Sequence, residues 1–162
     1  MPHRLIATIL VAAAALALGR AHDAAAQAPA NERELARKLG AAKRLECKFT
    51  TLATGTWDGA KTSATVTKAD VSVTFTDIDV DSGTAEADSG FGNAFISVKL
   101  SGGYLHFMQI SDTGPLYVTT VLATETAPGR LKAMQTRHEY SPTVLPGFTS
   151  RPELYVGDCA VK

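Results

Sequence analysis

The densest run of side chains able to do chemistry is Arg137-His138-Glu139-Tyr140, which holds a cation, an imidazole, a carboxylate and a phenol. An imidazole beside a carboxylate can act as a general acid or base when a nucleophile lies within hydrogen-bond reach. Along a strand, however, residues 137 and 138 point to opposite faces and do not line one pocket without a bulge. No nucleophile elbow, zinc-protease motif or phosphate-binding glycine loop accompanies the run. We assign no catalytic residue, and keep a small hydrolase or isomerase using His138 as an alternative.

A second acidic run has part of the pattern of a calcium loop. Asp77, Asp79 and Asp81 offer the carboxylate oxygens that Ca²⁺ prefers. The sixth position of the loop is Ser82 instead of glycine, and the twelfth is Asp88 instead of glutamate. The residues between the carboxylates are isoleucine and valine, an alternation typical of a strand with one solvent face. We therefore predict no metal site and no cofactor.

The chain contains two cysteines, Cys47 and Cys159. Neither stands in a C-x-x-C pair or at metal-ligand spacing from another cysteine or histidine, which argues against redox catalysis and against zinc. In an oxidising compartment we expect a disulfide that joins the two ends of the domain, with two buried free thiols as the alternative.

The N-terminus has the layout of a cleaved signal peptide. Basic Arg4 precedes the 15 uncharged residues from Leu5 to Gly19, and Ala24-Ala25-Ala26 supplies a small-residue cleavage site. A membrane span needs about 20 apolar residues, so this run is short for a permanent anchor. A retained N-terminal anchor is the alternative interpretation. We predict a signal peptide over 1–26, a periplasmic or secreted bacterial protein, and no stable membrane anchor after cleavage.

The rest of the chain divides into a short helical segment and one β domain. Residues 27–44 form a linker and a helix over about 31–43, with Asn31 as the N-cap. From Leu45 to Lys162, runs rich in threonine, valine and aromatic residues alternate with turn residues, which is typical of strands. The strands are expected near 45–54, 61–67, 70–80, 83–88, 93–101, 103–111, 115–124, 129–140 and 153–160.

Short turns such as Gly102-Gly103 make sequential strands antiparallel neighbours. We predict an all-β, up-and-down meander of about eight strands that closes into a calycin-like barrel, because closure removes exposed strand edges. A β-sandwich is the alternative. A bulge is expected near Thr76-Asp77, where the apolar alternation changes parity. Several later strands are apolar on both faces, and we expect the N-terminal helix to cover the outer one, with a loop or a partner as the alternatives.

The run Gly55-Thr56-Trp57 resembles the Gly-x-Trp of lipocalins, in which the tryptophan plugs the closed end of the barrel. A tryptophan that is simply part of the core is the interpretation we favour, and we take the resemblance as an indication of the fold only. The resemblance implies a fold whose open end receives a small apolar ligand. The expected ligand-binding residues are Trp57, Tyr104, Phe107, Tyr117, Arg137, His138 and Tyr140.

The C-terminal half also resembles small exported bacterial proteins. The similarity depends on the Arg137-His138 pair and on the terminal run Tyr155-Val156-Gly157-Asp158-Cys159. It implies export from a bacterial cell and carries no activity with it.

Composition narrows the function classes further. Sixteen Lys and Arg balance 16 Asp and Glu, so the chain lacks the basic excess that nucleic-acid binders use. The 45% of hydrophobic residues is enough for a folded core. We predict a non-enzymatic exported module that binds a small apolar or amphipathic ligand or an envelope partner. The alternatives are the His138 enzyme and a structural or assembly protein.

Overall fold

The computed structural model describes residues 30–88, 93–110, 112, 114–141 and 151–162. The predicted signal peptide and the start of the linker lie outside the described residues. One helix, α2 (Ala30–Ala41), precedes eight strands: β1 (Leu45–Asp58), β2 (Lys61–Asp79), β3 (Thr84–Asp88), β4 (Asn93–Ser101), β5 (Tyr104–Ile110), β6 (Leu116–Ala127), β7 (Arg130–His138) and β8 (Glu153–Val161).

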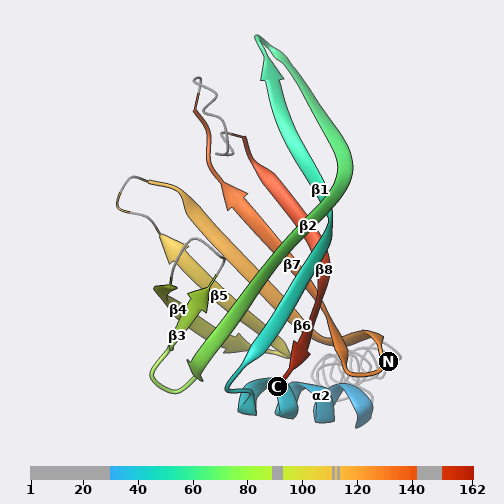
Figure 1. Ribbon diagram of the computed structural model, residues 1–162, viewed down its shortest axis with the longest axis vertical. Coiled ribbons are helices and arrows are strands. Elements are labelled where there is room, and N and C mark those ends of the chain that lie inside the picture. The colour runs from blue at the N-terminus through green and yellow to red at the C-terminus, as the bar shows by residue number, and fades with distance from the viewer. Residues whose placement is uncertain (1–29, 89–92, 111, 113, 142–150) are drawn as a thin grey trace, which may run out of the picture. The chain divides into compact units, whose positions relative to one another are not determined.

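The eight strands form one closed antiparallel ring in sequence order (Figure 1). Each strand pairs with the next along the chain, and β1 pairs with β8 to complete the ring. The predicted all-β meander with one short helix is therefore confirmed, and the strands do not divide into the two sheets of a sandwich. The two strands expected at 61–67 and 70–80 are one strand, β2.

The predicted disulfide closes the ring covalently. Cys47 and Cys159 lie directly opposite each other in the register of β1 with β8, and their sulfur atoms are bonded. The expected bulge is also present, because the register of β2 with β3 shifts between Thr76 and Asp79. Asp77 within it adopts a positive φ of 50°, which is uncommon for a residue other than glycine.

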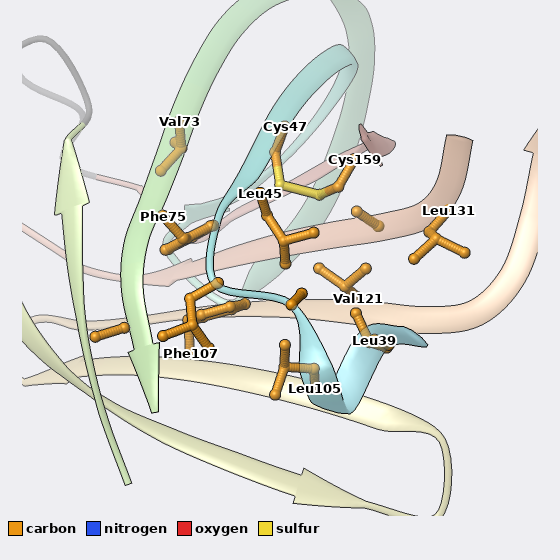
Figure 2. Packing of buried hydrophobic residues seen from close by; sticks show 14 of the residues in the cluster. Leu39, Leu45, Cys47, Val73, Phe75, Leu105, Phe107, Val121, Leu131 and Cys159 are labelled. Carbon is orange, nitrogen blue, oxygen red and sulfur yellow. A yellow bond between two sulfur atoms is a disulfide. The ribbon is translucent and has the colours of Figure 1, made fainter. Parts of the chain in front are cut away.

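The hydrophobic core fills the end of the ring nearest α2 (Figure 2). Phe75 and Phe107 stack within it, with ring centroids 3.9 Å apart. Leu39 of α2 is fully buried and joins Leu105 and Val121 in the same cluster. The helix thus closes one end of the ring, because its apolar face meets the inward side chains of the strands.

The expectation that α2 covers the outer face of the apolar strands is wrong. The helix buries its leucines at the end of the ring, and large apolar side chains on the outside stay exposed. Met108, Ile110, Met134, Leu154 and Val156 are between 37% and 76% exposed. A 12-residue helix has one narrow apolar stripe, and here the interior core occupies that stripe.

Candidate functional site

Polar side chains fill the interior of the ring where β6, β7 and β8 lie side by side. Alternate residues of each strand point inward. The register places Tyr117, Arg137 and Glu153 in one row, and Thr119, Gln135 and Tyr155 in the adjacent row. We call these six residues the interior polar cluster. Four of them, Thr119, Gln135, Glu153 and Tyr155, are more than nine-tenths buried.

Glu153 is the acceptor around which the cluster is organised. The Tyr155 hydroxyl donates a hydrogen bond to Glu153 Oε2 across 2.6 Å, and Arg137 Nη1 lies 3.8 Å from the same oxygen. The Arg137 guanidinium also lies over the Tyr155 ring, 4.9 Å from its centroid, and 5.9 Å from that of Tyr117. A buried carboxylate needs such a cation and donor, because transfer of an unpaired charge from water into the protein interior costs free energy.

Both tyrosines of the cluster hold their protons more tightly than a tyrosine in water. Burial, with the hydrogen bond to Glu153, raises the pKa of Tyr155 to about 12. Burial also raises the pKa of Tyr117, whose hydroxyl donates to Glu139 Oε2 across 3.1 Å. Desolvation and a nearby carboxylate both disfavour the phenolate. Each hydroxyl is therefore a neutral donor at physiological pH.

Gln135 is the exception to this pattern of satisfied groups. Its side chain is 92% buried, and within the described part of the chain its Oε1 atom has no hydrogen-bond partner. An unpaired buried acceptor costs about 1–3 kcal/mol relative to one that is hydrogen-bonded. A methionine or leucine would fill the same position without that cost. The amide is therefore a polar group that a ligand's N–H or O–H could satisfy.

Three further side chains form a rim at the same end of the ring. Trp57 meets Tyr140 edge to face, with ring centroids 5.5 Å apart, and the Arg151 guanidinium lies 5.4 Å from the centroid of the Tyr140 ring. Tyr140 follows the end of β7 and Arg151 precedes the start of β8, so both lie beyond the row that contains Arg137. Trp57 is 50% and Tyr140 56% exposed, which leaves aromatic surface accessible to a ligand.

The structure separates the seven predicted ligand-binding residues into three groups. Tyr117 and Arg137 belong to the interior polar cluster, and Trp57 and Tyr140 to the rim. The remaining three lie elsewhere in the fold: Phe107 is buried in the core, while Tyr104 and His138 are exposed on the outside.

Trp57 corrects one detail of the sequence interpretation. It is neither a core residue nor a plug of the closed end, because half of its surface is exposed and α2 closes the opposite end. His138 and Arg137 do point to opposite faces, as expected from parity. The His138 imidazole hydrogen-bonds Thr136 Oγ1 at 3.1 Å on the outer surface, away from the interior polar cluster.

Sequence reasoning did not identify Thr119, Gln135, Glu153 and Tyr155. Parity carried a usable signal, because residues 153, 155, 157 and 159 share one face of a strand. Cys159 must face inward to meet Cys47 inside the ring, so Glu153 and Tyr155 must face inward too. On β7, Gln135 and Arg137 are two positions apart and therefore also share one face of their strand.

The acidic run at Asp77 to Asp81 does not gather into a metal site. Asp79 Oδ1 accepts the backbone N–H groups of Asp81 and Ser82, at 3.0 and 3.1 Å, which lowers the pKa of Asp79 and fixes a turn. Within the part of the chain that the structure describes, no group of three or more His, Cys, Asp or Glu side chains could hold a metal ion.

A groove of about 400 Å³ lies at the other end of the ring, between α2, the turn from β6 to β7 and the C-terminus. Arg37 and Lys38 line it, but both already pair with Glu34. Lys162 pairs in the same way with Glu46, at 3.5 Å. Among the described residues of this groove no buried side-chain polar atom lacks a partner as Gln135 Oε1 does, so the interior polar cluster is the stronger candidate site.

Among the described helices, none is long and apolar enough to cross a bilayer. Comparison with known proteins finds no matching family model, no matching curated protein and no matching solved structure.

Proposed function

We propose that this chain is an exported binding protein that holds a small amphipathic ligand in the end of a calycin-like barrel away from α2. The single observation that carries the proposal is the buried Gln135 Oε1 atom, which has no hydrogen-bond partner among the described residues and is set among inward-facing Arg137, Glu153 and Tyr155. A ligand that donates an N–H or O–H to this oxygen would supply the hydrogen bond that no described residue provides.

The chemistry of the surrounding groups supports an amphipathic ligand over a purely apolar one. The cluster presents polar atoms beside the faces of Tyr117 and Tyr155, and the rim adds the exposed rings of Trp57 and Tyr140. Sites for small molecules commonly combine aromatic walls with a few fixed polar groups. The apolar part of the ligand would lie along the rings while its donor reaches Gln135.

Export is supported by the N-terminal sequence and by the disulfide. Structural disulfides persist in oxidising compartments and are rare in the cytosol. The Cys47–Cys159 bond joins the first and last strands of the ring, as a structural disulfide does.

A matched pair of probes tests the proposal. The alcohol 1-octanol can donate a hydrogen bond, whereas its methyl ether cannot. Trp57 is the only tryptophan of the chain and lies on the rim, so its fluorescence reports binding at this end. We expect 1-octanol to bind about 5- to 150-fold more tightly than the ether, because only the alcohol satisfies Gln135.

Substitution then separates the role of Gln135 from general hydrophobicity. In Gln135→Met the preference for the alcohol should disappear. Met134→Gln is the control, because it adds an amide on the outer face of the same strand, where Met134 is 39% exposed; the preference should persist there. Absence of saturable binding by either probe, together with a bare mass for the protein isolated from its own cells, would refute the proposed function.

A further inference from the structure

The long hairpin of β1 and β2 extends past the rest of the ring (Figure 1). Strand pairing of β1 with β8 ends at Thr54, after which the Gly55 N–H donates to the Pro152 carbonyl at 2.9 Å, and β1 continues to Asp58 paired with β2. On its other edge, β2 pairs with β3 only from Thr74 to Asp79. Among the described residues, the backbone of β2 from Lys61 to Val73 therefore has no strand beside it on that edge.

The part of this edge from Lys61 to Lys68 has the properties of an unfilled strand position. All eight side chains are exposed, and neither proline nor a bulge interrupts the segment. Thr62, Thr65, Val66 and Thr67 are β-branched, which suits an extended backbone. From Lys61 to Ala64, opposite the part of β1 that lies beyond its strand pairing with β8, the hairpin has two strands only. A two-stranded hairpin is only marginally stable in water, so a third strand would stabilise it.

The charges along the edge indicate what that third strand must carry. Lys61 and Lys68 flank six uncharged residues. If a second copy of this chain paired antiparallel over the full segment, Lys61 would lie opposite Lys68 at both ends. Like charges directly opposite each other destabilise a sheet, which disfavours a second copy. An extended segment with acidic residues at its two ends places opposite charges there instead.

We propose that the Lys61–Lys68 edge of β2 is a docking site for an extended segment of another protein, with acidic residues seven positions apart. The segment adds to the sheet as an antiparallel strand, in the manner of β-augmentation. Backbone hydrogen bonds hold it, and the two lysines set its register. This surface is separate from the interior polar cluster, and the inference does not depend on the proposed ligand.

Two synthetic octapeptides with blocked ends test the inference on the full chain with its disulfide intact. One is Glu-Thr-Val-Ser-Thr-Val-Thr-Glu, and the other has lysine at both ends. We expect the glutamate peptide to bind about tenfold more tightly, measured by calorimetry, and to slow amide hydrogen exchange over residues 61–68. The double variant Lys61→Glu/Lys68→Glu should reverse the preference.

A matched control places the same charge changes away from the hairpin. Lys99 and Lys132 are exposed on β4 and β7, and the double variant Lys99→Glu/Lys132→Glu should keep the wild-type preference. Circular dichroism checks that every variant remains folded. If neither peptide binds, if both bind equally, or if exchange slows only through self-association of the chain, the inference is overturned.

Discussion

Removing the Tyr155 hydroxyl should destabilise the fold in a way that depends on pH. The hydroxyl donates across 2.6 Å to the buried Glu153 carboxylate, while the ring itself packs against Phe49 with centroids 6.4 Å apart. Tyr155→Phe keeps the ring and deletes only the donor. A hydrogen bond to a charged group contributes about 1.5–3 kcal/mol, so we expect that loss in the free energy of unfolding at pH 8.

The difference between wild type and Tyr155→Phe should then shrink in alkali. The folded pKa of Tyr155 is about 12, whereas an unfolded tyrosine titrates near 10. Above pH 10 the unfolded wild-type chain loses a proton that the folded chain retains, which favours unfolding. This stabilising contribution is complete below pH 10 and is lost as the pH rises toward 12. At pH 11 the loss is about 1.4 kcal/mol, and Tyr155→Phe does not experience it.

Urea denaturation of both proteins at pH 8 and pH 11, followed by circular dichroism, measures these differences. Tyr104→Phe is the control for removing a phenolic hydroxyl, because the Tyr104 side chain is 47% exposed on the outer surface; it should change stability at pH 8 by less than about 0.5 kcal/mol. If the difference between wild type and Tyr155→Phe were the same at both pH values, the assignment of a neutral, buried donor to Tyr155 would be refuted.

Two further predictions concern the closure of the ring. Reduction of the Cys47–Cys159 bond, which spans 112 residues, should lower the free energy of unfolding by about 2–5 kcal/mol; urea midpoints with and without a reductant measure this, and unchanged midpoints would contradict it. Gly157→Ala should cost more than about 3 kcal/mol, because the added Cβ would overlap the Lys48 carbonyl and lie 2.7 Å from Phe49 Cα. Wild-type thermal stability in that variant would show that the two strands can separate there without penalty.

Local sequence rules were sufficient for most of the fold. Turn residues and apolar alternation gave antiparallel neighbours, and the two cysteines gave the closure of the first strand on the last. The helix at 30–41 was also predictable, because its leucines repeat at helical spacing. Where the helix packs was not predictable, since an apolar stripe indicates burial but does not say against which surface.

The candidate site was predictable only in part. Arg137 and Tyr117 were identified by residue type, and the structure places them in neighbouring positions of β6 and β7. Glu153 and Gln135 were missed because an isolated glutamate or glutamine in a strand usually faces water. Only the closed ring shows that the side chains of these two residues point into its interior. For Trp57 the prediction of a core position was wrong. Large aromatic residues are generally buried, but this one lies on the rim with half of its surface exposed.

The pairing of β1 with β8 also constrains the order in which the molecule can form. One edge of the first strand has no partner until the last strand has been made. The two strands are far apart in sequence, since Cys47 and Cys159 are separated by 112 residues. Because the chain is made from its N-terminus, β1 is synthesised long before β8, and the growing chain holds an open sheet for most of its synthesis. The ring can therefore close only after β8 has been made, and deletion of Glu153–Val161 would leave that edge of β1 without its partner strand.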